Sequence, residues 1–379
     1  RASGAEEAAS SMARSSPLSH GPVPLRFGIW DWLDRPPGVP VADLYEQRLR
    51  LLEAADAAGF YCYHLAEHHG TPLSAAPSPN VFFAAASQRT RRIRLGALVY
   101  LLPLYHPLRL VEEIAMLDHL TRGRLEVGVG RGASPYELAM FGITPEEAPA
   151  VFREALEVIV QGLATGDLRY EGRYFRFAEA RADLRPLQQP YPPLWYPTTN
   201  ARSIPWVARE GFNTIYGFGF LSPTLEDTRE QLARYAALHA AHATTPGRLN
   251  GHVTAPLYGI TRQVYLAETD AQALREARVA FGDFFANFNY LWALHGNDRY
   301  SSRVDFDQLV EQGLLLVGSP ATVRAQLERY LATVGGNYFA GVFAFGSLTS
   351  EQVLRSFNLF VREVMPALQR AGGAQAPAG

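Results

Sequence analysis

Short apolar segments alternate with helical patterns along most of this chain. Polar or glycine residues bound each apolar segment, which is typical of strands buried in a sheet. In residues 41–59, apolar positions recur every three or four residues and the helical pattern ends at Gly59. The whole pattern predicts eight strands, near residues 26–30, 60–65, 93–99, 124–129, 193–197, 213–217, 253–266 and 339–345.

This alternation indicates an α/β protein with a parallel sheet. Eight strand-helix repeats joined by right-handed crossovers predict a closed (β/α)8 barrel, a TIM barrel, with insertions after the fourth and seventh strands. A doubly wound open sheet is the alternative, but its glycine fingerprint belongs at the first strand, whereas GVGRGA lies at residues 128–133. We therefore predict one barrel domain over residues 25–370, with a disordered tail at 1–24 and a flexible tail at 371–379.

The composition narrows the range of partners and chemistries. A formal net charge of -2 gives no positive field that would attract nucleic acid or an anionic membrane, and no apolar run reaches the roughly 18 residues of a membrane helix. All 35 basic residues are arginine, which excludes lysine Schiff bases. Cys62 is the only cysteine, so an internal disulfide is impossible and we expect a cytoplasmic protein.

Glu67, His68 and His69 directly follow the second predicted strand. In α/β barrels this junction faces the active site, and imidazole exchanges protons near neutral pH. Two histidines hydrogen-bonded beneath a loop would explain the same residues. His64 precedes His68 by four residues, but that helical spacing brings no two ligands together in a strand-to-loop segment, so we predict no metal site.

Two neighbouring segments of the predicted rim suit an anion. The fourth strand ends in GRGAS (130–134), where glycine lets the backbone approach a ligand and Arg131 supplies a guanidinium group. The fifth strand is followed by TTN (198–200) and a helix that starts near residues 201–203. Together they are able to hold one phosphate, although TTNARS is also an ordinary helix N-cap.

The chain resembles the bacterial luciferase-like flavin-dependent monooxygenases from about Leu25 to Leu368. The motifs that carry the resemblance are AEHH (66–69), LPLYHPLRLVEEIAMLDHLTRGRLEVGVGRG (102–132), VGSP (317–320) and FNLFVREVMPAL (357–368).

The resemblance implies a two-component oxygenase. Its FMN arrives already reduced from a separate flavin reductase, forms a flavin hydroperoxide with dioxygen, and passes one oxygen atom to a small organic substrate. A covered apolar cavity keeps water from that intermediate. The resemblance also implies a homodimer through the second and third helices. The helical segment 78–90 is apolar around much of its circumference, which agrees with such a contact or with burial beneath the preceding loop.

Residue roles follow from the same resemblance. His68 is the implied catalytic base or hydroperoxide-stabilising residue at the reactive flavin edge, with His69 and Glu67 in support, and a cis peptide between Leu98 and Val99 is implied beneath the flavin ring. The implied cofactor-binding residues are Leu98, Val99, Arg131, Gly132, Ala133, Thr198, Thr199, Asn200 and Ser203. The chain also departs from the family pattern. Gly130 replaces the reactive cysteine of the luciferase α chain, Thr199 replaces a glutamate, and Pro149 replaces a phosphate-binding arginine, for which Arg153 is a candidate substitute.

Aromatic residues around the predicted rim indicate a bulky apolar or aromatic substrate. Segment 281–300 is rich in Phe, Tyr and Trp and follows the seventh strand, where a lid is able to close. Packing within the insertion or at a subunit contact explains these aromatics equally well. The expected pocket residues are Trp30, Trp32, Phe218, Phe220, Phe285 and Trp292.

Two other functions are compatible with the same barrel. One is a deazaflavin-dependent oxidoreductase that transfers hydride without dioxygen, and AEHH favours the monooxygenase over it. The other is a flavin-binding partner subunit without catalytic activity, against which the presence of both His68 and Arg131 argues.

Overall fold

The computed structural model describes residues 24–300 and 304–374. Nearly all of the predicted tail at 1–24 lies outside these residues. The last helix, α12 (Met365–Ala374), reaches into the predicted tail at 371–379, whose residues 375–379 also lie outside.

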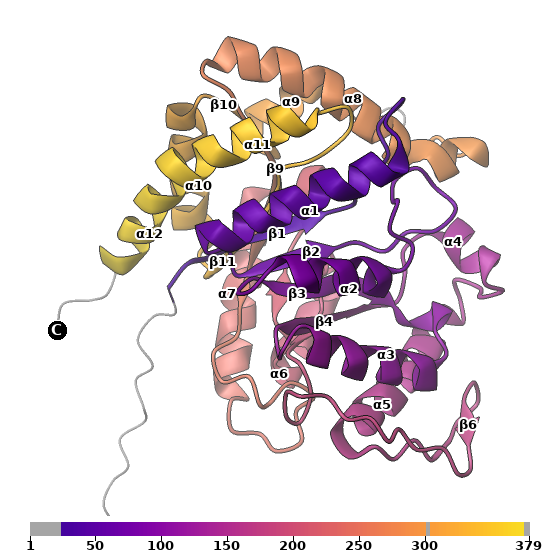
Figure 1. Ribbon diagram of the computed structural model, residues 1–379. Helices are drawn as coiled ribbons and strands as arrows, with labels where there is room; N and C mark the ends of the chain where they lie inside the picture. Colours follow the sequence, from indigo (N-terminus) through magenta and orange to yellow (C-terminus); the bar gives the residue numbers. More distant parts are fainter. Residues whose placement is uncertain (1–23, 301–303, 375–379) are drawn as a thin grey trace, which may run out of the picture.

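Eight parallel strands form the barrel that the alternating pattern predicts (Figure 1). Hydrogen-bonded ladders give the order β8-β9-β11-β1-β2-β3-β4-β7. The backbone between β7 and β8 is joined by isolated bridges, Trp195 to Asn213 and Thr198 to Tyr216. The strands are β1 (Arg26–Asp31), β2 (Cys62–Leu65), β3 (Arg94–Leu101), β4 (Leu125–Gly130), β7 (Leu194–Trp195), β8 (Thr214–Ile215), β9 (Tyr258–Leu266) and β11 (Tyr338–Val342).

Helices cover the outside of this barrel (Figure 1). The helix predicted at 41–59 is α1, which ends where Gly59 adopts a left-handed conformation with φ 81. The covering helices are α1 (Val41–Ala58), α2 (Pro79–Arg89), α3 (Pro107–Leu120), α5 (Ala148–Thr165), α6 (Ile204–Glu210), α7 (Leu225–Ala241), α10 (Pro320–Val334) and α11 (Ser350–Leu359).

Both predicted insertions are present. The first follows β4 and contains the six-residue helix α4 (Pro135–Met140) and the hairpin of β5 (Tyr170–Glu171) with β6 (Arg176–Phe177). The second follows β9 and contains α8 (Asp270–Leu294), α9 (Phe306–Glu311) and β10 (Leu315–Gly318).

Three strand predictions need correction. The strand expected at 253–266 starts at Tyr258, because a turn and Pro256, which lacks a backbone N–H, precede it. The strand expected at 339–345 ends at Val342, and the apolar residues beyond it are buried in a loop. Strand β10 was not predicted. It pairs with the last four residues of β9, on the side of β9 opposite to β11.

Large side chains fill the interior of the barrel. The buried Glu126 carboxylate accepts hydrogen bonds from the Tyr61 hydroxyl and from Nε1 of Trp195, at 2.7 and 2.6 Å, and pairs with Arg94. His64 is buried beside them, and burial lowers its pKa to about 3. His64 is therefore a neutral core residue.

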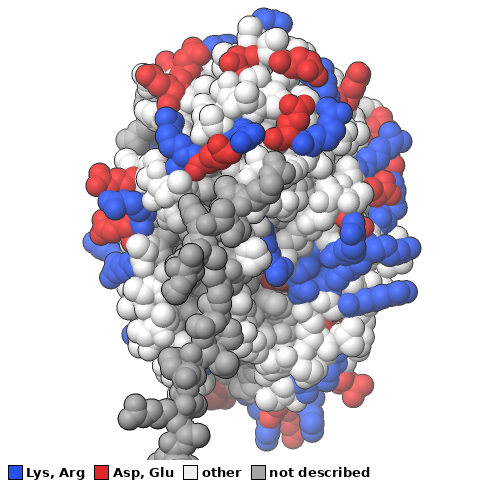
Figure 2. Space-filling view, turned by 90° about the vertical axis from the view of Figure 1, so that its left-hand side faces the viewer, with Lys and Arg blue, Asp and Glu red and all other residues white. Residues whose placement is uncertain are grey.

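Surface charge is mixed in sign. Figure 2 shows acidic and basic side chains on the same face, with basic side chains gathered toward one side of it. Ion pairs such as Arg89 with Glu53 join opposite charges on the surface. No helix in residues 24–300 or 304–374 is both long and apolar enough to cross a membrane.

Candidate active site

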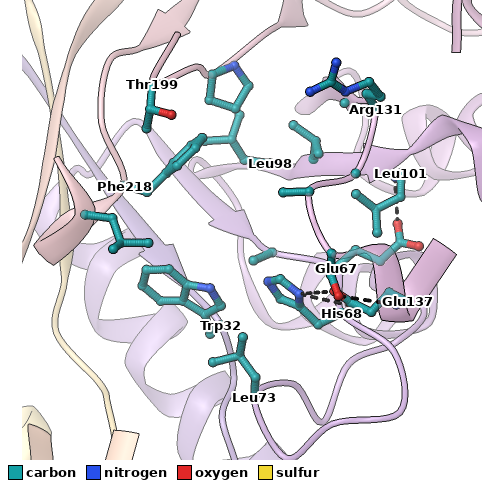
Figure 3. A pocket seen from close by; sticks show the side chains of 18 of the residues that line it. Trp32, Glu67, His68, Leu73, Leu98, Leu101, Arg131, Glu137, Thr199 and Phe218 are labelled. Atoms are coloured by element: carbon teal, nitrogen blue, oxygen red, sulfur yellow. Dashed lines mark hydrogen bonds and ion pairs between the residues drawn. The ribbon is translucent and has the colours of Figure 1, made fainter. Parts of the chain in front are cut away.

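A pocket of about 580 Å³ opens at the carboxyl ends of the barrel strands, a size within the range of cofactor and substrate sites. Residues that follow six of the barrel strands line it, together with the end of α8 (Figure 3). The sequence-predicted residues that line it are Trp30, Trp32, Glu67, His68, Leu98, Val99, Arg131, Gly132, Ala133, Thr198, Thr199, Asn200, Ser203, Phe218 and Trp292. The structure thus brings most of the predicted site together.

His68 is held by a carboxylate that the sequence analysis did not select. Its Nδ1 lies 3.2 Å from both oxygens of Glu137, and the backbone N–H of His69 donates to Glu137 at 2.7 Å. The imidazole is 27% exposed, and its other nitrogen, Nε2, faces the open pocket (Figure 3). His68 is therefore fixed on one side and free to act on the other.

The two groups of this pair stabilise each other's charge. Burial alone lowers the pKa of His68, but the Glu137 carboxylate and its hydrogen bond outweigh burial and raise that pKa above its usual value. Burial likewise raises the pKa of Glu137, and the His68 charge and hydrogen bond outweigh it, so that pKa is lowered. The arrangement favours a protonated His68 beside an ionised Glu137.

Glu67 and His69 form a second pair behind the first. The buried Glu67 carboxylate lies 2.7 Å from Nε2 of His69 and accepts the hydroxyl of Tyr105 at 2.8 Å and the backbone N–H of Leu101 at 3.2 Å. The imidazole of His69 is turned toward Glu67 and does not line the pocket. A direct catalytic role for His69 is therefore not supported, and its side chain orients Glu67 from outside.

The pocket floor is built where β3 meets β4. The peptide bond between Leu98 and Val99 is cis, as the resemblance implied. The pairing of β3 with β4 shifts register at this point. A Cβ atom at Gly130 would lie 2.3 Å from Cγ2 of Val99, and one at Gly128 would lie 2.2 Å from the carbonyl oxygen of Ala97. Glycine is required at both positions because the floor occupies the space of a side chain.

Groups at the other end of the pocket suit a phosphate. The exposed guanidinium of Arg131 and the hydroxyls of Thr199 and Ser203 line this end, and within residues 24–300 and 304–374 the structure shows no hydrogen bond from any of the three groups. Thr198 and Asn200 accept backbone N–H groups at 2.9 and 3.0 Å, so they also form the turn that the N-cap interpretation predicted.

Arg153, the suggested substitute for a missing phosphate ligand, does not line the pocket. Its side chain is exposed on α5, outside the set of residues that surround the phosphate end of the pocket.

The aromatic wall differs in part from the prediction. The rings of Trp30 and Trp32 lie 4.5 Å apart, and Phe218 lies 5.4 Å from Trp30. Phe220 and Phe285 do not line the pocket; Phe220, in the segment after β8, packs against Phe285 of α8 with ring centroids 6.0 Å apart. The part of α8 that lines the pocket is its C-terminal end, with Phe288, Leu291 and Trp292, whereas Phe285 lies earlier on the helix and packs against Phe220.

The sequence analysis did not select several of the lining residues. For Glu137 the sequence does contain an indication: Ser134, Pro135 and Glu137 follow the pattern of a helix start, and the Ser134 hydroxyl accepts the Glu137 backbone N–H at 3.3 Å. Arg299 and Tyr300 line the pocket from the loop after α8. Within the described ranges, no cluster of three or more histidine, cysteine or acidic residues is arranged to hold a metal ion.

Comparison with known proteins identifies the family. The model of the luciferase-like monooxygenase family matches residues 25–337. The chain is 38% identical to the uncharacterized protein y4wF of Sinorhizobium fredii, over 91% of this chain and 97% of that protein. It is 30% identical to limonene 1,2-monooxygenase of Rhodococcus erythropolis (84% and 80% covered) and 27% identical to the oxygenase component of the flavin-dependent trigonelline monooxygenase of Acinetobacter baylyi (86% and 91% covered).

Solved structures agree. The monooxygenase RslO1 from Streptomyces bottropensis superimposes with a TM-score of 0.79 at 29% identity, covering 90% of this chain and 99% of that one. The oxygenating constituent of 3,6-diketocamphane monooxygenase from Pseudomonas putida, solved with FMN, gives a TM-score of 0.74 at 22% identity, with 90% and 98% covered, and supports the fold. The chain belongs to the luciferase-like monooxygenase family and is a flavin-dependent monooxygenase.

Proposed function

We propose that this protein is the oxygenase component of a two-component monooxygenase whose FMN is reduced by a separate flavin reductase. One observation carries the proposal: a single pocket contains the His68 imidazole, the apolar floor of Leu98 and Val99, and a cationic end formed by Arg131. One relative is named as an oxygenase component, and one structural neighbour was solved with FMN.

The residues fit FMN in shape and in charge. Reduced FMN supplies the two electrons that activate dioxygen, so that one oxygen atom enters the substrate and the other leaves as water. Arg131 and the hydroxyls of Thr199 and Ser203 hold the phosphate, while Leu98 and Val99 support the ring. His68, kept protonated by Glu137, presents a proton at Nε2. The wall formed by Trp30, Trp32 and the end of α8 excludes water.

A labelling experiment tests the reaction. Protein, chemically reduced FMN and ¹⁸O₂ are mixed with a panel of cyclic ketones, terpenes and aromatic compounds, and products are analysed by mass spectrometry. We expect a product that carries one ¹⁸O atom and requires reduced FMN. Transfer of hydride from a reduced deazaflavin to a substrate, without oxygen consumption, would instead support the deazaflavin function.

The phosphate site gives a first mutational prediction. Arg131→Ala should weaken FMN binding by about tenfold or more, because a charged hydrogen bond contributes about 1.5–3 kcal/mol, and should leave riboflavin binding nearly unchanged. Isothermal titration with both flavins measures this difference. Arg299→Ala is the matched control, since it removes the other arginine of the pocket lining. The assignment fails if Arg299→Ala, and not Arg131→Ala, removes the preference for FMN.

We also propose a bulky apolar or aromatic substrate, and a cytoplasmic location that agrees with the single free cysteine. The substrate proposal rests on the wall formed by Trp30, Trp32, Phe218 and Trp292, whose rings leave a largely apolar space.

A homodimer is proposed through α2 and α3, which pack side by side. Val81 on α2 is 72% exposed, and Met116 and Leu120 on α3 are 54% and 43% exposed, with helical spacing that puts the last two on one face. The double variant Val81→Glu, Met116→Glu should convert a dimer to a monomer in light scattering. Val279→Glu, at a 66% exposed position on α8, is the control. A wild-type monomer at micromolar concentration would contradict the proposal.

A further inference from the structure

The short helix α4 contacts the site on one side and the lid on the other. Glu137 points inward to His68, whereas Tyr136, its neighbour, contacts the end of α8. Adjacent residues on a helix point about 100° apart, so one rigid turn is able to present these two side chains in different directions.

Three contacts join Tyr136 to the second insertion. Its ring stacks in parallel on His295, with centroids 4.1 Å apart and planes at 1°, and meets the edge of Trp292 at 5.2 Å. Its hydroxyl accepts a hydrogen bond of 3.0 Å from Nδ2 of Asn297. The Tyr136 side chain therefore contacts the insertion both through its ring and through its hydroxyl.

The contacted segment, residues 292–300, contributes Trp292, Arg299 and Tyr300 to the pocket lining; we call it the lid segment. Trp292 lines the pocket, its ring lies 5.2 Å from that of Tyr300, and the Arg299 guanidinium lies 5.4 Å from its centre. A turn and a half earlier on α8, Asn287 is anchored to the barrel by a bond of 3.1 Å to the buried Asp34 carboxylate. Tyr136 thus holds the part of α8 that lies beyond this anchor.

Helix α4 has six residues, far fewer than an isolated helix needs to be stable in water. Its orientation therefore depends on the contacts made at both sides. We propose that Tyr136 is a positioning residue, which couples closure of the lid segment over the pocket to the hold of Glu137 on His68. The pocket then presents a protonated imidazole when it is covered, and the value of this coupling to turnover rests on the proposed function.

The first test measures the pKa of His68 in variants of the lid segment. Asn297→Ala removes the hydrogen bond from the lid side and leaves α4 intact. In ¹⁵N-histidine-labelled protein without flavin, the pKa of His68 measured by NMR should fall from the wild-type value toward that of Glu137→Gln. Tyr136→Phe loses the same hydrogen bond and should lower the pKa of His68 by a similar amount. Tyr136→Ala should bring that pKa closer to the value in Glu137→Gln.

The reciprocal test measures backbone amide exchange in the lid segment when a residue of the site is changed. Coupling between two places acts equally in both directions. Backbone amide exchange in the lid segment should therefore accelerate in Glu137→Gln, a variant that does not touch that segment. In Tyr136→Ala we expect an increase of about tenfold, which corresponds to about 1.4 kcal/mol. Tyr290→Ala, at a 42% exposed position on α8 outside the pocket lining, is the control and should alter neither quantity.

The proposal is overturned if the lid variants speed exchange while the pKa of His68 stays at the wild-type value, or if Glu137→Gln leaves exchange in the lid segment unchanged. A Tyr136→Ala protein that does not fold leaves the Asn297→Ala and Tyr136→Phe measurements to decide. All readouts use protein without flavin. A failure of the monooxygenase proposal would therefore leave them valid, and their failure would leave the monooxygenase proposal standing.

Discussion

Replacement of His68 by alanine is expected to reduce product formation by about 100-fold or more, the usual contribution of a general acid or base. The reason is geometric: its Nε2 faces the pocket while Nδ1 is occupied by Glu137, and among residues 24–300 and 304–374 no other histidine lines the pocket. FMN binding should change little, because Arg131 lies at the other end of the pocket. Electrons from reduced FMN should then appear as hydrogen peroxide instead of product.

The measurement is the ratio of product to hydrogen peroxide per reduced FMN consumed. His242→Ala, which replaces a histidine outside the pocket lining, is the control and should leave that ratio unchanged. A His68→Ala protein with normal coupling would contradict the role assigned to this residue.

Glu137→Gln is expected to change both the pH dependence of activity and the stability. The variant keeps the shape of the side chain and loses its charge, so the pKa of His68 should fall. The alkaline limb of the activity profile should therefore move to lower pH, because His68 loses its proton earlier. An unchanged alkaline limb would show that Glu137 does not set the protonation of His68.

The stability effect depends on pH in a defined direction. The pKa of His68 is raised, so its contribution is complete below the ordinary histidine pKa and is lost as pH rises through the raised value. The pKa of Glu137 is lowered, so its contribution is complete above the ordinary carboxyl pKa and is lost as pH falls through the lowered value. Between these limits Glu137→Gln should lower the free energy of unfolding by about 1.5–3 kcal/mol.

Denaturant unfolding at several pH values checks this dependence. The loss caused by Glu137→Gln should be largest near neutral pH and should shrink toward both extremes. Glu146→Gln, an exposed substitution just before the start of α5, is the control. An equal loss at every pH would mean that packing, and not charge, explains the effect.

The barrel could be predicted because its strands are buried on both faces and leave continuous apolar runs in the sequence. Strand β10 was missed although LLLV (314–317) has the same character, because a short apolar run inside an insertion does not distinguish a strand from a buried loop. Residues 343–345 misled in the opposite direction, because apolar residues also occur where a loop is buried. A run of apolar residues indicates that a segment is buried, but it does not show whether the backbone of that segment pairs with a neighbouring strand.

Site residues at the ends of consecutive strands could be predicted from the sequence, whereas a contact between distant segments could not. His68, Leu98 and Arg131 lie in consecutive rim segments, so topology alone assembles them. Glu137 joins His68 across 69 residues, and only the short helix α4 brings them together. Phe285 was chosen for its chemistry, but it lies earlier on α8 and packs against Phe220, and Phe288, nearer the end of the helix, lines the pocket.

The most direct measurement is the crystal structure of the protein with FMN bound. The account predicts the phosphate within hydrogen-bond distance of Arg131 and of the Thr199 or Ser203 hydroxyl, the ring against Leu98 and Val99, and the reacting edge of the ring beside Nε2 of His68. A flavin seated with its phosphate at Arg299, or bound outside this pocket, would contradict it.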